Sequence, residues 1–185
     1  MPKIDTVIFT GHMIDLADRA EPRFPPALEQ AAAAAIRRHL SDIARKMPDE
    51  RIGYASAARG GDILFHEQAR ALGFRTVIVL PFAPVLFEKT SVSGLAGGGW
   101  MARFHALWDQ SQPRDRIDMN LPMASEAYAS CNARMIELAR ARGNYHLVAL
   151  WDGKSGDGPG GTADLVERAE ADGDNPHIIR PADLR

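Results

Sequence analysis

Residues 52–82 carry the clearest fold signal in the chain: IGYASAARGGDILFHEQARALGFRTVIVLPF. An apolar strand-like run at its start is followed by the glycine turn Gly60–Gly61, a stretch of helical period that stops at Gly73, and a run rich in β-branched residues. Such a run is typical of a strand in a sheet covered on both faces. The segment therefore predicts a strand–helix–strand unit with two parallel strands and a right-handed crossover.

The same alternation continues on both sides of this unit. No internal repeat or linker divides the chain, so we expect one domain spanning residues 1–185. The fold class that this order predicts is a three-layer α/β, Rossmann-like sandwich with a mainly parallel, doubly wound sheet. The further elements are a strand at TVIFTGH (6–12), a helix at PALEQAAAAAIRRHLSDIARKM (26–47), a helix at SEAYASCNARMIELARARG (125–143), a strand at YHLVALW (145–151), a loop and helix at GKSGDGPGGTADLVERAEADG (153–173) and a short strand at HIIRP (177–181).

Residues 83–122 break the alternation. They hold the glycine cluster SGLAGGGW, a short helix around WMARFHALW and a polar connector, DQSQPRDRIDMNLP. Trp100, Phe104 and Trp108 recur every four residues, which places them on one helical face, and we expect them to pack inside the protein rather than stack on a ligand. Long irregular segments in compact domains are usually functional or mobile, so this one is expected to cover a binding site or to contact another subunit.

Composition narrows the classes of function. A net charge of -2 and a pI near 6.3 give no general attraction to nucleic acid or to anionic membranes. The single Cys131 fits a reducing, cytoplasmic location, and the first residues resemble a strand rather than a signal peptide or a membrane span. HEQAR at residues 66–70 begins like the zinc motif HExxH but has Arg70 where the second His should stand. We therefore expect neither a metal site nor a cofactor.

Three glycine-containing turns fall where a doubly wound fold binds ligands, beyond the carboxyl ends of the strands. Gly11 ends the first strand, Gly60–Gly61 follow the second, and the turn at Gly160–Gly161 follows YHLVALW and precedes a helix. Glycines allow close approach of the backbone, and a helix start offers unpaired N–H groups to phosphate. The spacing matches neither GxGxxG nor GxxxxGK[ST]. The turns predict a phosphate or nucleotide site, the alternative being flexible surface loops with capped helices.

Two segments also carry a family resemblance. ASAARGGDILFHEQARALGFRTVIVLPF (55–82) resembles the DNA-processing protein A family, and ALWDGKSGDGPGGTADLVERA (149–169) is similar in placement to the PGGxGTxxE loop of the LONELY GUY phosphoribohydrolases. Together they resemble the SLOG superfamily of Rossmann-like domains. FTGHMID with EPRFP, and LWDGKSGDGPGGTA, are similar to a bacterial SLOG branch found beside repeat or effector domains in larger proteins. The resemblance implies binding of a nucleotide-like ligand, such as a nucleoside phosphate or an ADP-ribose-like molecule. The domain would then report its occupancy to a partner or a fused effector.

The resemblance also implies a set of binding residues. Phosphate would lie against the backbone of the Gly60–Gly61 and Gly160–Gly161 turns, with Thr162 as a hydroxyl donor or a helix cap. Asp62 would face a ribose hydroxyl or cap its helix, while Arg23 and Arg59 would contact phosphate oxygens or remain solvated turn residues. The remaining candidates for polar or close backbone contacts are Gly11, His12, Ser56 and Asn132.

Two other functions stay open. A phosphoribohydrolase would need Arg134 and Glu167 as its catalytic pair, but PGGTADLVE is one residue shorter than the family loop. One residue is about 100° around a helix, which would turn Glu167 away from the site, and Asp164 is the possible substitute. Binding of single-stranded DNA is disfavoured by the acidic charge and by the lack of a basic stripe with interleaved aromatics. We therefore expect a ligand sensor rather than a hydrolase, with a second copy of the chain as another possible partner.

Overall fold

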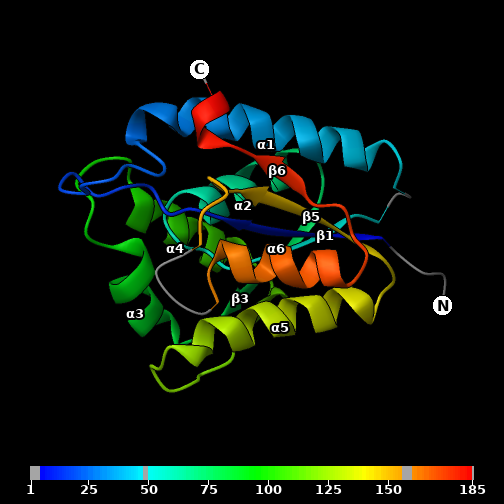
Figure 1. Ribbon diagram of the computed structural model, residues 1–185. Coiled ribbons are helices and arrows are strands. Elements are labelled where there is room, and N and C mark those ends of the chain that lie inside the picture. The colour runs from blue at the N-terminus through cyan, green and yellow to red at the C-terminus, as the bar shows by residue number, and fades with distance from the viewer. Residues whose placement is uncertain (1–4, 48–49, 156–159, 185) are drawn as a thin grey trace.

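The computed structural model describes residues 5–47, 50–155 and 160–184. Its centre is a sheet in which all six described strands run parallel, in the order β4-β3-β2-β1-β5-β6 (Figure 1). The predicted α/β sandwich with a mainly parallel sheet is confirmed. The strands are β1 (Thr6–Gly11), β2 (Ile52–Ala55), β3 (Arg75–Leu80), β4 (Arg116–Asp118), β5 (Tyr145–Leu150) and β6 (His177–Ile179).

Helices cover both faces of the sheet, as the crossover rule requires. On one face, α1 packs on α2 and α4 packs on the other side of α2, while α5 and α6 lie together on the opposite face (Figure 1). The helices are α1 (Glu29–Ala44), α2 (Gly61–Ala71), α3 (Pro84–Phe87), α4 (Trp100–Gln110), α5 (Glu126–Arg140) and α6 (Thr162–Ala171), with a π-helical turn at Glu88–Val92 and 3₁₀ turns at Pro26–Leu28, Pro113–Asp115 and Pro181–Asp183.

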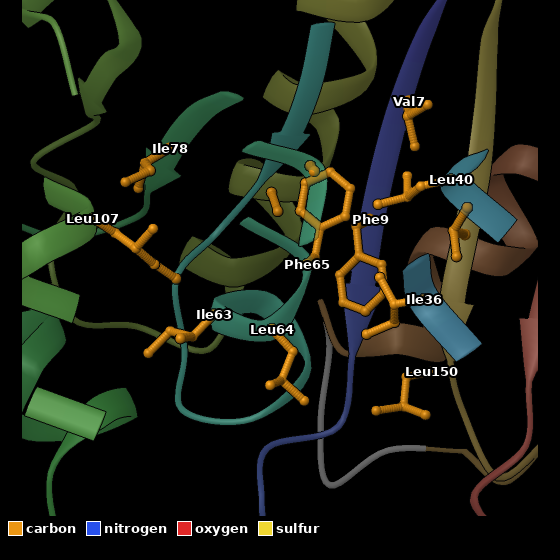
Figure 2. Packing of buried hydrophobic residues seen from close by; sticks show 14 of the residues in the cluster. Val7, Phe9, Ile36, Leu40, Ile63, Leu64, Phe65, Ile78, Leu107 and Leu150 are labelled. Carbon is orange, nitrogen blue, oxygen red and sulfur yellow. The ribbon is translucent and has the colours of Figure 1, made fainter. Parts of the chain in front are cut away.

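Side chains of β1 divide the core into two layers. Val7 and Phe9 pack on the face of α1 and α2, and Ile8 packs on the face of α5 and α6. Figure 2 shows Phe9 beside Phe65 of α2, with ring centroids 5.0 Å apart. Gly53 of β2 makes room for that ring, because a Cβ there would lie 2.7 Å from the Phe65 side chain. These contacts fix α2 against the sheet and so fix where its first residues lie.

The strand order reverses between β1 and β5, which are hydrogen-bonded neighbours although most of the chain separates them. Their register pairs Gly11 with Leu150, and the N–H of His12 donates to the Leu150 carbonyl at 3.0 Å. The chain after β1 leads into α1 on one face of the sheet, and the chain after β5 leads into α6 on the opposite face. In doubly wound folds such a reversal creates a crevice beyond the carboxyl ends of the strands.

One of the six described strands was not predicted. Strand β4 lies inside the stretch expected to be a polar connector, and among the described strands its partner is β3. Three residues with two charges carry no hydrophobic pattern from which a strand can be recognised. An ion pair between Arg75 and Asp115, at 2.6 Å, joins β3 to the turn just before β4. Long-range pairing, rather than local sequence, therefore forms this strand.

Candidate functional site

A cavity of about 350 Å³ opens at the strand-order reversal, beyond the carboxyl ends of β1 and β5. Its volume lies within the range of small-molecule sites. The three predicted glycine turns gather at this one edge, as expected, but not all of their residues face the cavity. The sequence-predicted residues that line it are Gly11, His12, Arg23, Ser56, Asp62, Asn132, Gly160, Gly161 and Thr162.

Two helix starts converge on the end of β1 from opposite faces of the sheet. At the start of α2, the Gly61 N–H donates to the His12 carbonyl at 3.1 Å. At the start of α6, the Thr162 hydroxyl lies 3.3 Å from the Thr10 hydroxyl. Gly161 is the N-cap of α6, and Gly161, Thr162 and Ala163 line the cavity. The first N–H groups of an α-helix have no partner within it and carry the positive end of its dipole.

The turn at Gly60–Gly61 serves the packing of α2. Gly60 has a φ of 99°, and a Cβ there would lie 2.5 Å from the backbone N of Ile14. A Cβ on Gly61 would lie 3.2 Å from the Gly11 Cα, and its N–H is already used by His12. Neither glycine is among the described residues that line the cavity. Their small size lets α2 begin against the chain that follows β1.

The turn at Gly160–Gly161 is positioned by α5. Gly160 has a φ of 84°, and a Cβ there would lie 2.2 Å from the backbone N of Ala129. Asn132 Nδ2 donates to the Gly160 carbonyl and to Asp164 Oδ2, both at 2.9 Å. Asn132 therefore holds the start of α6 in place as well as lining the cavity. Residues 156–159 of the predicted loop lie outside the described residues.

Arg23, Asp152 and His12 form a network at the rim of the cavity. Arg23 donates from Nε and Nη2 to the two carboxylate oxygens of Asp152, each at 2.9 Å. These bonds hold the pKa of Asp152 well below its usual range. The Asp152 N–H donates to His12 Nε2 at 3.1 Å, while burial and then the Arg23 charge lower the pKa of His12. The same Nε2 lies 3.1 Å from Asp152 Oδ1. The lowered pKa favours the neutral form of the His12 ring at pH 7.

Arg59 has a structural contact that the sequence did not reveal. Its side chain is nearly buried, and Nη1 donates to the Ser93 carbonyl at 2.9 Å. Its backbone N–H donates to the Ser91 carbonyl, also at 2.9 Å. Arg59 thus ties the β2–α2 turn to the π-helical turn and is not among the described lining residues.

The irregular segment 83–122 forms one wall of the cavity. Phe87, Thr90 and Ser91 line it, and the Ser91 hydroxyl lies 3.3 Å from the Tyr128 hydroxyl of α5. This part of the segment therefore lines the cavity, while its role as the cover of a binding site stays a prediction. Farther along the segment, Trp100 and Phe104 of α4 are buried in the core. Trp108, the third aromatic residue of that face, is half-buried and stacks on Phe104. All three therefore pack against the core, as expected.

Asp62 lies in the cavity wall at the second residue of α2. One carboxylate oxygen accepts the N–H of Ala58 at 3.2 Å, so the side chain closes the turn before its own helix. The side chain is 7% exposed, and burial raises its pKa to about 7. An acid in this state is half protonated near neutral pH, which is uncommon for a carboxyl group.

One face of α5 was largely missed by the sequence analysis, which singled out only Asn132. Tyr128, Cys131, Asn132 and Met135 all line the cavity. Their spacing of three and four residues is the signal that would have found them, because it places them on one side of a helix. Cys131 donates to the Val79 carbonyl at 3.3 Å, and burial raises its pKa to about 12. Its thiol is therefore protonated and unreactive.

Arg134 and Glu167, the pair that a hydrolase would need, do not meet at the cavity. Arg134 is paired with Glu137 on the outer side of α5, at 2.6 Å, and Glu167 is exposed on α6. Neither residue is among the described residues that line the cavity. Asp164, the possible substitute, is bonded to Asn132 and to Arg168, each at 2.9 Å.

The histidine that begins the zinc-like motif HEQAR is buried in the core. His66 is fully buried, its Nε2 lies 2.7 Å from the Ser56 carbonyl, and burial lowers its pKa to about 4. In the part of the chain that the structure describes, no three or more His, Cys, Asp or Glu side chains are arranged to hold a metal ion. No helix formed by the described residues is long and apolar enough to cross a membrane.

Comparison with known proteins identifies a structural neighbour. No protein family and no curated protein matches the chain by sequence. The solved structure of DNA processing protein A (DprA) from Streptococcus pneumoniae is similar over 95% of this chain and 50% of that chain, with a TM-score of 0.53 and 14% identity. This chain thus spans about half the length of that protein. The resemblance to DNA-processing protein A is confirmed at the level of the fold.

Proposed function

We propose that the chain is a binding domain for a nucleotide-like ligand, whose phosphate lies at the N-terminus of α6. The observation that carries this proposal is the convergence of the α6 start, the end of β1 and a cavity at the strand-order reversal. Ligands of doubly wound folds bind at that point, and helix starts bind phosphate through backbone N–H groups and the helix dipole.

The other walls of the cavity suit the rest of a nucleotide. Phe87, Met135 and Trp151 contribute apolar surface against which a base can pack. His12 and Asp62 are polar groups available to orient a sugar or a second phosphoryl oxygen. The Arg23 charge, by contrast, is balanced by Asp152, so the helix start rather than a free guanidinium supplies the attraction for phosphate.

Binding is favoured over hydrolysis by the placement of the acids. Glu167 is exposed and Asp164 is held by Asn132 and Arg168, so neither is poised to act on a sugar in the cavity. We propose that the chain acts as one domain and signals ligand occupancy to a partner protein. Single-stranded DNA is the competing ligand, since the structural neighbour is a DNA-processing protein by name.

A pair of matched variants tests the phosphate contact. Gly161 has extended backbone (φ -72°, ψ -175°), which Asn and Asp both adopt as helix N-caps. We expect Gly161→Asp to lose binding of AMP and ADP-ribose at least tenfold relative to Gly161→Asn, because only Asp adds a negative charge where the phosphate lies. Thermal-shift and calorimetric titrations measure this, since a bound ligand raises the melting temperature.

Adenosine and a short single-stranded oligonucleotide serve as control ligands. Adenosine lacks phosphate, so its weaker binding should be the same in both variants. Equal affinity of the two variants for AMP and for ADP-ribose would contradict a phosphate site at α6. Binding of the oligonucleotide alone would replace the nucleotide proposal with DNA binding, and release of free base on incubation would replace it with hydrolysis.

A further inference from the structure

Asp62 is a buried carboxyl group in the cavity wall without a cationic partner among the described residues. It is 7% exposed, and its hydrogen-bond partner among the described residues is the Ala58 N–H at 3.2 Å. None of the ion pairs between described residues includes it. A buried carboxylate without a counter-charge is costly, so the group favours its neutral form.

The position of Asp62 brings it into the same cavity as the proposed phosphate. Gly61, its neighbour in the chain, is bonded to His12, and Thr10, two residues before His12, meets Thr162. The starts of α2 and α6 therefore flank one three-residue stretch. A phosphate at α6 and the Asp62 carboxyl share a small space in which two negative charges would repel each other.

No described neighbour neutralises an ionised Asp62. The Arg59 side chain in the same turn donates to Ser93, and Arg23 is bonded to Asp152. The other titratable groups on the cavity wall are His12 after β1, and Tyr128 and Cys131 on α5. Farther along α2 itself lie His66, Glu67 and Arg70. Glu67 is paired with Arg103, and Arg70 donates to Thr76, Ser111 and the Leu107 carbonyl, so neither is bonded to Asp62. Burial lowers the pKa of His66 to about 4 and raises that of Cys131 to about 12, so both are uncharged at neutral pH.

We propose that Asp62 makes ligand binding proton-linked: with an anionic ligand in the cavity it is a carboxylic acid that donates a hydrogen bond to a ligand oxygen. The inference rests on the proposed function. Binding then takes up one proton from solvent when Asp62 is ionised in the free protein, and none when it is already protonated. Burial raises the pKa of the free group to about 7, which places the change within the physiological range. Asp62 thereby selects ligands that present a hydrogen-bond acceptor at this wall.

Calorimetric titration with ADP-ribose across neutral pH tests the linkage. Each phosphorus of this probe carries one sugar ester and the shared anhydride oxygen, so it keeps a single ionised oxygen near neutral pH and contributes no proton change of its own. For the wild type we expect Kd to be constant at acidic pH and to rise about tenfold per pH unit above about pH 7. Asp62→Asn keeps the shape of the side chain and lacks its charge, so its Kd for ADP-ribose should be the same at every pH tested. His12→Gln should retain the pH slope of the wild type.

A second readout needs no variant. Titration of the wild type at pH 8 or so, in two buffers with different ionisation enthalpies, should show uptake of about one proton per ADP-ribose bound. ADP-ribose binding without proton uptake, or a slope that persists in Asp62→Asn, would overturn this inference and leave the proposed function intact. Failure of ADP-ribose and AMP to bind at any pH would overturn both.

Discussion

At the scale of single residues, the cavity combines polar groups that look alike in sequence but differ in role. The sequence predicts phosphate contacts for both Arg23 and Arg59, yet Arg23 is bonded to the Asp152 carboxylate and Arg59 to the Ser93 carbonyl. Asp62, in contrast, keeps a carboxyl group in the cavity wall. These roles depend on contacts between distant parts of the chain, such as Arg23 with Asp152, which local sequence does not encode.

The first residue-scale prediction concerns Arg23→Gln. This change removes two charge-assisted hydrogen bonds from a largely buried pair, and we expect it to lower the free energy of unfolding by about 1.5–3 kcal/mol. It should also raise the pKa of His12, because the Arg23 charge now lowers that pKa and Asp152 would no longer be neutralised. Urea denaturation and an NMR titration of the His12 ring measure the two effects.

Arg19→Gln is the matched control. Arg19 contacts Asp15 at 3.4 Å with a side chain that is 36% exposed, and such pairs contribute less than about 1 kcal/mol. The pKa of His12 should change much less in this variant, because Arg19 is not among the charges that shift it and Asp15 is the smallest of those that do. An unchanged His12 pKa in Arg23→Gln would contradict the rim network, because it would show that the Arg23 charge does not act on His12 in solution.

At the scale of elements, helix starts are placed by the glycines before them. The sequence identified the Gly60–Gly61 and Gly160–Gly161 turns, but it assigned all four residues to phosphate. The structure instead uses Gly60 and Gly160 for close contact with the chain after β1 and with α5. Sequence reveals that such a position needs glycine, and only the fold reveals whether the neighbour is a ligand or another backbone segment.

Gly160→Ala tests the contact with α5. A Cβ at this position would lie 2.2 Å from the Ala129 N, while Gly173, which has almost the same φ (82°), has nothing within 4 Å. Positive φ costs an alanine about 1–2 kcal/mol at either site. Overpacking should add about 1–3 kcal/mol at Gly160 only. Thermal unfolding of the two variants measures the difference, and equal losses would contradict the close packing of this turn on α5.

At the scale of the whole molecule, hydrophobic periodicity was sufficient to predict the α/β class, because long apolar strands and amphipathic helices alternate through most of the chain. The edge strand β4 escaped prediction, since it is short, polar and formed by pairing with β3. The glycine turns were sufficient to predict a candidate site beyond the carboxyl ends of the strands. The contribution of α5 to the cavity wall could not be predicted from the sequence, because it depends on how that helix crosses β1, β2 and β3.

The central claim is that phosphate binds at the start of α6, in the cavity at the strand-order reversal. Two-dimensional amide NMR during titration with ADP-ribose, and with adenosine as the control, tests it most directly. We expect the largest phosphate-dependent shifts at Gly161, Thr162 and Ala163, with smaller ones at Gly11 and His12. Shifts centred on His146 and His177, at the amino ends of β5 and β6, and on the neighbouring His39 would contradict the account. So would the absence of shifts at saturating ADP-ribose.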